Sequence, residues 1–419
     1  MRNLFKIAIR NLLRFRRRTL LTASLICIGV VFVLVFNSVT GSFKNLMIGQ
    51  ITDSFLGDVQ IHRRGYVASM DNLPLTMNLT GQELTLIEKA IAENKAIASY
   101  SERIKFGGLF SNFNESTNIR INGVDPEKEF ATVPMLLSRI IKKKKDPSPT
   151  KTSLMKGSIL VPELLARGLK LKVGDTTVVV ATNKDGSVNG KTFKISGIME
   201  SATGPGGRDG YIHIADAREI LRLRKKEVSE IALNLKNLGQ AKQVANVLRT
   251  SLAGVLNKKG KPKFEVHPWP KLSPFANIAK MIDVITFFIR LILIAVVLIS
   301  ILNVMMMSVY ERVREIGTIS AIGTPPRTIL SLFLIEGLCM GIFGAIVGVV
   351  LGGGTIFALN LIEIPFEFGR GGSFILTPSI HPLEVILVSG LVIVISVLAS
   401  LQPAYKASRM EPIDALRHV

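Results

Sequence analysis

Residues 291–310 read LILIAVVLISILNVMMMSVY, a run without a charged side chain that decides the class of the fold. A helix needs about 20 mostly apolar residues to cross roughly 30 Å of hydrocarbon. Three further runs meet this requirement, namely Thr19–Phe43, Thr328–Ile362 and Val385–Tyr405. Ala276–Arg290 extends the second run outward. We therefore predict an α-helical membrane protein with four transmembrane helices.

Charge sets the expected orientation, because short cytoplasmic flanks carry an excess of Lys and Arg. Residues 1–18 hold seven cations and no acid, whereas 363–384 hold one Arg and three Glu. We expect a multi-pass protein of the bacterial inner membrane with both termini in the cytoplasm. The predicted segments are 1–18 (cytoplasmic basic helix), 19–43 (first transmembrane helix), 44–275 (extracytoplasmic domain), 276–310 (second helix), 311–327 (cytoplasmic helix), 328–362 (third helix), 363–384 (outer loop), 385–405 (fourth helix) and 406–419 (cytoplasmic tail).

The N-terminal segment has a helical charge pattern. Arg2, Lys6, Arg10 and Arg14 recur every four residues and share one helix face. This pattern predicts an amphipathic helix on the anionic inner membrane surface. The alternative is a charge run that only sets the topology.

The segment 44–275 interleaves predicted strands and helices, which indicates an α+β domain inserted between the first and second transmembrane helices. The expected strands are Val59–Ile61, Asn118–Val124, Gly157–Val161, Thr176–Thr182, Lys191–Ile198, Gly210–Ile214 and Val228–Leu235. The expected helices are Gly81–Asn94, Pro162–Gly168, Ala215–Arg224 and Gly239–Leu256, with a loop at Gly204–Gly210 and a linker at Lys142–Thr150. Both cysteines, Cys27 and Cys339, lie inside spans, so we expect this domain to fold without a disulfide.

Several function classes lack their signatures. A net charge of +21 could indicate nucleic-acid binding, but the predicted topology places most of that charge outside the cytoplasm. Lipid headgroups, an acidic partner and plain solubility remain as explanations. The segment Gly186–Thr192 has three residues between its glycines where a P-loop has four, which favours a hairpin. The five histidines are scattered. We therefore expect no catalytic residue, no metal site and no cofactor in this chain.

The segment Tyr310–Arg327 (YERVREIGTISAIGTPPR) predicts a short helix with an abrupt end. Opposite charges three residues apart support the helix, and a glycine followed by two prolines ends it. Ile316, Ile319 and Ile322 offer an apolar ridge. Such a helix between two spans suits docking to a cytoplasmic partner; an ordinary helical hairpin is the alternative.

The spans contain packing signals and a few ionisable groups. Small residues four apart let a neighbouring helix approach closely, which we expect at Gly337, Gly341, Gly344, Gly348 and Gly352. Glu336 is the one acid deep in a span. It either has a transport or coupling role, snorkels, or pairs with an Arg. Asp283 and Arg290 share a face of the second helix, where a structural ion pair or a headgroup contact is expected.

Several features of the chain are typical of one family: Asn11–Arg14 before the first span, one plus three spans around a large outer domain, the Glu-Ile-Gly-Thr core of Glu311–Gly323, and the ending Pro403–Arg417. In these features the chain resembles the MacB/FtsX-type permeases of bacterial ABC transporters. The outer domain is most similar to the lipoprotein-release (Lol) permeases, through Arg120–Pro126, Leu169–Asp175, Phe193–Ile198 and Tyr211–Leu221. The cell-division members have a smaller outer domain, and the MacB branch fuses an ATPase that this sequence does not contain.

The resemblance implies a pair of permease subunits, identical or different, above two separate ATPase subunits that bind ATP and Mg. This chain would then be a transport subunit and not an enzyme. The short helix would be a coupling helix in an ATPase groove. Its expected contact residues are Glu311, Arg312, Arg314, Glu315, Ile316, Gly317, Ile319, Ala321 and Gly323.

The resemblance also implies a cargo, a lipoprotein that enters from the outer leaflet between the first span of one subunit and the second span of the other. Expected path residues are Val35, Val39, Phe43, Asp283, Phe287 and Arg290. In the release permeases a long hairpin captures a periplasmic carrier. The matching segment here, Ala181–Lys191, is short, with candidate contacts at Asn183, Asp185, Gly186 and Asn189.

That short hairpin leaves alternatives open. The chain can be the partner subunit that lacks the hook, a homodimeric variant, or a relative that exports another amphiphile such as an antibiotic or a peptide. A regulator of an envelope hydrolase is a further alternative, and a membrane enzyme is the weakest.

Overall fold

The computed structural model describes residues 2–141, 154–200, 209–223, 226–363, 365–367 and 373–411. It divides into two compact units. We call the first the helical unit (Met1–Asn45, Lys280–Phe366 and Ile375–Val419) and the second the sheet unit (Leu46–Ala279 and Glu367–Phe374). The expected linker Lys142–Thr150 and most of the expected loop Gly204–Gly210 lie outside the described residues.

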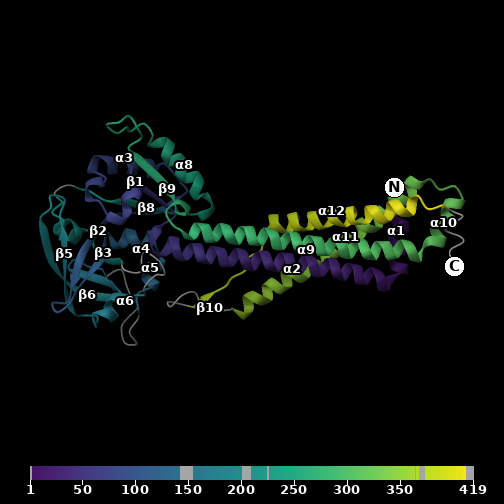
Figure 1. The fold of residues 1–419 in the computed structure, drawn as a ribbon, viewed down its shortest axis with the longest axis horizontal. Coiled ribbons are helices and arrows are strands. Elements are labelled where there is room, and N and C mark those ends of the chain that lie inside the picture. Colours follow the sequence, from purple (N-terminus) through teal and green to yellow (C-terminus); the bar gives the residue numbers. More distant parts are fainter. Residues whose placement is uncertain are drawn as a thin grey trace. The chain divides into compact units, whose positions relative to one another are not determined.

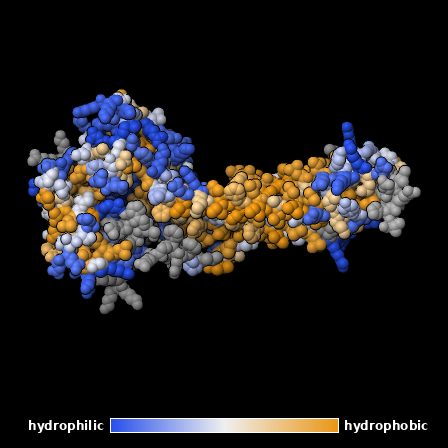
Figure 2. Space-filling model, viewed as in Figure 1, coloured by the Kyte–Doolittle hydropathy of each residue, from blue (hydrophilic) through white to orange (hydrophobic). Residues whose placement is uncertain are grey.

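Long helices form the helical unit, and four of them are long and apolar enough to cross a membrane. In Figure 1 these four run side by side, and Figure 2 shows hydrophobic residues covering the visible face of the bundle. The helices are α1 (Arg2–Arg14), α2 (Arg16–Ile51), α9 (Phe275–Glu311), α10 (Val313–Ala321), α11 (Pro326–Ile362) and α12 (Pro382–Ser408), and a small sheet pairs β10 (Pro365–Glu367) with β11 (Ser373–Ile375).

The core of the helical unit draws side chains from every long helix. Ile26 of α2, Ile301 of α9 and Phe333 of α11 are almost fully buried in one cluster, which also contains Ala404 of α12. Many other apolar side chains on these helices stay exposed, for example Phe343 at 54%. An apolar surface of this kind suits a lipid environment, and the chain is a multi-pass membrane protein.

In the residues that the structure describes, nine strands and several short helices build the sheet unit. The strands are β1 (Val59–Arg63), β2 (Ile97–Ser111), β3 (Ser116–Val124), β4 (Ser158–Pro162), β5 (Thr176–Thr182), β6 (Val188–Met199), β7 (Asp209–His213), β8 (Glu230–Leu235) and β9 (Phe264–Pro268). The α-helices are α3 (Gly81–Ala92), α4 (Pro126–Thr132), α5 (Met135–Ser138), α6 (Glu163–Gly168), α7 (Ile214–Ile220) and α8 (Ala241–Ser251). A π-helix, η1 (Thr52–Leu56), continues directly from α2.

Strand β2 organises the sheet, whose order is β3-β7-β4-β6-β5-β2-β8-β1-β9 with a further pairing of β3 and β2. Along one edge β2 pairs first with β8, from Ile97 to Arg103, and then with β5 at Leu109–Ser111. Along the other edge Arg103–Ser111 pairs with β3. The pairings from β2 through β3, β7, β4, β6 and β5 therefore return to β2 and close a ring.

The sequence predicted most of these elements. β5 has the expected bounds, and the other six expected strands and four expected helices are confirmed with shifted ends. β2, β9, α4 and α5 were not predicted. α3 begins with a capping box in which Thr80 and Glu83 exchange hydrogen bonds, a signal that favours a helix start. The P-loop-like segment lies on β6 and in the turn before it, which confirms the hairpin interpretation.

Candidate functional site

The short helix α10 follows α9 after one non-helical residue. That residue is Arg312, with φ −112° and ψ 17°. Glu311 is the last residue of α9, which corrects the expectation of one helix from Glu311 to Gly323. At the other end Gly323 has φ +91°, a left-handed conformation that favours glycine. The abrupt end before Pro325 and Pro326 is confirmed.

α10 has a buried side and an exposed side. Ile316 is 4% exposed and Gly317 is buried, whereas Ile322 is 78% exposed. The expected ridge of Ile316, Ile319 and Ile322 is therefore wrong as a single surface, because it turns from the core to the outside. Of the expected partner contacts, those on the outside are Glu311, Arg314, Ala321 and Gly323, those half-buried are Glu315 and Ile319, and those buried are Arg312, Ile316 and Gly317.

Arg312 forms a buried ion pair with the one acid deep in a span. Its Nη1 lies 2.9 Å from Oε1 of Glu336 on α11, and the two side chains are 5% and 1% exposed. Arg312 Nε also donates to Glu315 at 3.2 Å. Its guanidinium carbon lies 5.6 Å from the ring centre of Phe333 and 5.8 Å from that of Phe15. Because Arg312 is enclosed in this way, it is removed from the expected docking surface.

Glu336 also binds the N-terminal helix. Asn11 Nδ2 on α1 donates to Glu336 Oε1 at 2.8 Å. The expected pairing of this acid with an arginine is confirmed, and the arginine belongs to the same chain. A coupling role of Glu336 stays a prediction. Removing one partner of a buried pair leaves an uncompensated charge and costs about 3–5 kcal/mol. The carboxylate of Glu336 thus fastens the segment before α10 and helix α1 to one point of α11.

A second link joins α1 to α10 at the surface. Arg14 Nη1 lies 3.5 Å from Glu315 Oε1, with side chains 68% and 40% exposed. Exposed pairs of this kind contribute about 0–1 kcal/mol. The buried Arg312–Glu336 pair is therefore the stronger connection at this site.

The five glycines of α11 mark close helix contacts. A Cβ on Gly337 or Gly341 would meet Ser400 or Ser396 of α12 at 2.5 and 2.8 Å. Farther along α11 the contacts pass to α2. There a Cβ on each glycine would meet a side chain of α2: Ile26 at 2.6 Å from Gly344, Val30 at 2.6 Å from Gly348 and Leu34 at 3.2 Å from Gly352.

Gly348→Ala is expected to destabilise the helical unit by about 1–3 kcal/mol, because the added methyl overlaps Val30. Gly354→Ala on the same helix is the matched control, since a Cβ there meets nothing within 4 Å and alanine favours helix. Thermal unfolding of the full chain in lipid nanodiscs measures both. Equal melting temperatures for the two variants would contradict the close contact.

The expected path residues lie on two adjacent helices, α2 and α9. Asp283 pairs with Lys44 of α2 at 2.6 Å, and Arg290 donates to Asn37 of α2 at 3.0 Å. The expected ion pair of Asp283 with Arg290 is therefore wrong, since Asp283 pairs with Lys44 and Arg290 donates to Asn37. Val35, Val39 and Phe43 are half-buried on α2, and Phe287 is exposed on α9.

The expected carrier hairpin connects β5 and β6 in the sheet unit. Its turn is short, with Gly186 at φ +87°. Asn183 Nδ2 donates to Ser187, and Asn189 Nδ2 donates to Ile220 O. The Ser187 hydroxyl and amide lower the pKa of Asp185. Asn183 and Asp185 therefore bond within the turn, whereas Asn189 links the start of β6 to the end of α7. Asp185 and Gly186 remain exposed at the tip.

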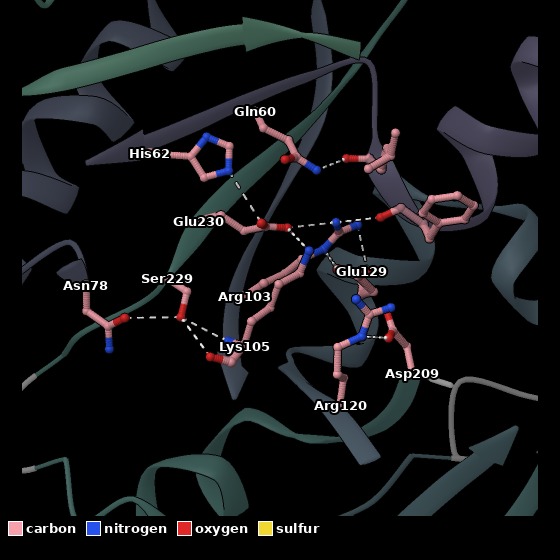
Figure 3. A network of polar contacts seen from close by, with 12 residues as sticks. Gln60, His62, Asn78, Arg103, Lys105, Arg120, Glu129, Asp209, Ser229 and Glu230 are labelled. Atoms are coloured by element: carbon pink, nitrogen blue, oxygen red, sulfur yellow. Dashed lines mark hydrogen bonds and ion pairs between the residues drawn. The ribbon is translucent and has the colours of Figure 1, made fainter. Parts of the chain in front are cut away.

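The sheet unit contains a buried charge network around Arg103 (Figure 3). The guanidinium lies 2.8 Å from Glu129 of α4 and 3.1 Å from Glu230 of β8, and all three side chains are at most 2% exposed. It also donates to the carbonyl of Phe55 in η1 at 2.6 Å. Arg103 thus connects η1 to the sheet.

Two further basic side chains approach the carboxylate of Glu230. Lys105 lies 2.8 Å and His62 3.4 Å from its carboxylate. Burial alone would raise the pKa of Glu230, but Lys105, His62 and Arg103 outweigh burial and hold this pKa well below its ordinary value. The carboxylate therefore stays ionised near neutral pH. Its stabilising effect is fully present above the ordinary pKa of glutamate and is lost progressively as the pH falls from there through the lowered pKa of Glu230.

Sequence comparison places both units in known families. Residues 19–251 match the MacB-like periplasmic core domain, and residues 287–412 match the FtsX-like permease C-terminal region. The macrolide export ATP-binding/permease protein MacB of Bdellovibrio bacteriovorus is 26% identical over 74% of this chain and 46% of its own length. The lipoprotein-releasing system transmembrane protein LolC of Neisseria meningitidis is 22% identical over 96% of this chain and 94% of its own length.

Other relatives align over parts of the chain. LolC of Xylella fastidiosa is 24% identical, and the alignment covers 62% of this chain and 65% of that protein. Among solved structures, the periplasmic region of MacB from Actinobacillus actinomycetemcomitans aligns with a TM-score of 0.34 and 11% identity, covering 52% of this chain and 92% of that one. The chain spans about half the length of its MacB relative, at 46%. Because the periplasmic-core match extends over more than half of the chain, this protein belongs to the ABC transporter permeases of the MacB/FtsX/LolC type.

Proposed function

We propose that this chain is a permease subunit that transmits motion from cytoplasmic ATPase subunits to extract lipoproteins from the outer leaflet of the inner membrane and deliver them to a periplasmic carrier. The observation that carries the proposal is the buried pair Arg312–Glu336, which fastens the base of α10 to α11. In the proposed assembly this chain pairs with a second permease subunit, identical or different. Two ATPase subunits, which bind ATP and Mg, attach on the cytoplasmic side.

The two sides of α10 suit a coupling role. Its exposed side includes Ala321 and Ile322, and in the proposal this side faces an ATPase groove. Its buried side rests on the core through Ile316 and Gly317. A push on the exposed side would move α11 and α1 together with α10, because Glu336 binds both Arg312 and Asn11. The proposed coupling role requires the termini and α10 to lie in the cytoplasm.

The helix α9 can carry the motion outward. It is continuous for 37 residues from Phe275 to Glu311, which corresponds to a rod of about 55 Å at 1.5 Å per residue. A rod of that length exceeds the hydrocarbon thickness of roughly 30 Å. We infer that α9 delivers displacement at Glu311 to the residues that begin the helix.

The proposed cargo follows from the free energy needed to remove an acylated protein from the membrane. Each buried CH₂ holds an acyl chain in the membrane by about 0.8 kcal/mol, so an acylated protein needs an external source of work to leave. The alignment with LolC across 96% of this chain supports lipoproteins as cargo. At the short β5–β6 hairpin, a carrier would meet Asp185 and Gly186 at the tip.

Export of another amphiphile, such as an antibiotic or a peptide, is the second candidate. It is favoured by the 26% identity to a macrolide export protein over 74% of this chain. Regulation of an envelope hydrolase is a more distant alternative, with the FtsX-like region as its only support. Increased drug sensitivity of a deletion strain with normal lipoprotein sorting would favour export.

Depletion of this protein tests the proposal. We expect lipoproteins to accumulate in the inner membrane, as measured by fractionation of the two membranes and detection of acylated proteins. Re-expression of the wild-type chain is the control and should restore sorting. Normal arrival of all lipoproteins at the outer membrane after depletion would overturn the cargo assignment.

A further inference from the structure

An apolar groove of about 350 Å³ lies where α1 and the start of α2 face α11. α1 contributes Phe5, Ile9, Leu12 and Leu13, and the other wall is formed by Thr19 and Ala23 of α2 and by the α11 segment 339–346. The rim is open, because Leu13 is 61%, Phe343 54% and Ile346 60% exposed. The groove is therefore open to the medium around the helical unit.

Cations border this groove along α1. Lys6 and Arg10 are exposed and follow the lining residues Phe5 and Ile9. At 3.6 residues per turn they lie beside the edge that Leu13 forms. Arg16 and Arg17, also exposed, lie where α1 gives way to α2. An apolar slot with guanidinium and ammonium groups at its edge complements a molecule with an alkyl chain and an anionic head.

We propose that the α1/α11 groove binds one anionic phospholipid, with an acyl chain along Phe343 and Ile346 and its phosphate head at Lys6 and Arg10. Lipid tails are as apolar as the groove, so burial of the chain alone gives little preference over the bilayer. Selectivity must therefore come from the head. A cation near a membrane surface favours an anionic head about fivefold, and two cations are expected to give tenfold or more.

The groove fits a lipid better than a protein segment. Its lining is almost entirely apolar, with Thr19 as its one hydroxyl-bearing side chain. A helix of a second subunit would have to cover Lys6 and Arg10 as well, which requires acidic partners. The bound lipid would connect α1 to α11 beside the Asn11–Glu336 hydrogen bond. Its presence would therefore stabilise the same junction.

Native mass spectrometry of the purified full chain tests this proposal. The probes are phosphatidylglycerol and phosphatidylcholine of matched acyl chains, titrated after delipidation. We expect phosphatidylglycerol to bind at least about tenfold more tightly than phosphatidylcholine at one site. Lys6→Gln combined with Arg10→Gln should remove this preference. Lys280→Gln, an exposed cation elsewhere in the helical unit, should leave it unchanged.

A second pair of variants tests where the acyl chain of the bound lipid lies. Ile346→Trp fills the groove and should abolish the selective site, whereas Val350→Trp, one turn farther along α11 and 67% exposed, should retain it. Equal affinity of the two lipids for the wild-type chain would overturn the proposal, as would unchanged selectivity in the Lys6/Arg10 variant or in Ile346→Trp. Loss of a dimer peak on Ile346→Trp without a change in lipid binding would assign the groove to a second subunit instead. These outcomes are independent of cargo, so they do not depend on the proposed function.

Discussion

Replacing Arg103 with methionine is expected to destabilise the sheet unit by about 3–5 kcal/mol, because it breaks a buried network of charges. The variant leaves Glu129 and Glu230 without their shared cation in a region where both carboxylates are fully buried. It also leaves the carbonyl of Phe55 without its donor. Methionine fills a similar volume, so the loss measures charge and hydrogen bonding more than packing.

Hydrogen–deuterium exchange on the full chain in nanodiscs measures this loss locally. Amides of β2 and β8 should exchange about a hundredfold faster or more, because their protection reports the free energy of opening. Arg120→Met is the matched control. Arg120 pairs with Asp209 at 2.8 Å in the same region (Figure 3), but its side chain is 38% exposed, so its removal should cost about 1 kcal/mol or less. Similar exchange in the two variants would show that burial does not strengthen the Arg103 network.

The same network shows how far the sequence could predict the fold. Long apolar runs and β-branched alternation are local patterns, so the four long helices and most strands of the sheet unit could be predicted. β2 could not, because its stretch Ile97–Ser111 mixes charged and apolar residues and pairs with three strands. Its Arg103 meets Glu230, a residue 127 positions away. No local pattern encodes such a contact.

In the candidate site, too, local features could be predicted from the sequence and tertiary contacts could not. Gly323 and the following prolines predicted the end of α10, since turn chemistry depends on neighbouring residues. Arg312 was assigned to the docking surface through the family resemblance, as a member of the expected coupling helix, and its i,i+3 pair with Glu315 was expected to support that helix. That pair exists at 3.2 Å. The decisive partner, however, is Glu336, which only tertiary packing brings close.

Arg312→Met is expected to uncouple the transporter, with cargo release per ATP hydrolysed falling about tenfold or more in the complex reconstituted with its ATPase subunits. The substitution leaves Glu336 buried with Asn11 as its remaining polar partner among the described residues. α10 then loses its strongest attachment to α11. Arg327→Met, which removes an exposed arginine just after the start of α11, is the matched control and should release cargo normally.

A double variant separates coupling from stability. Arg312→Met together with Glu336→Met removes both buried charges, and such replacements are often neutral for stability. We expect the double variant to melt near the wild-type temperature and still to release cargo poorly, because methionine cannot make the directed bonds to Glu315 and Asn11. Restored release in the double variant would show that the ion pair serves folding alone. Normal release by Arg312→Met in a correctly inserted complex would remove the pair from the coupling route altogether, and α10 would then have to act through Ile316 and the core beneath it.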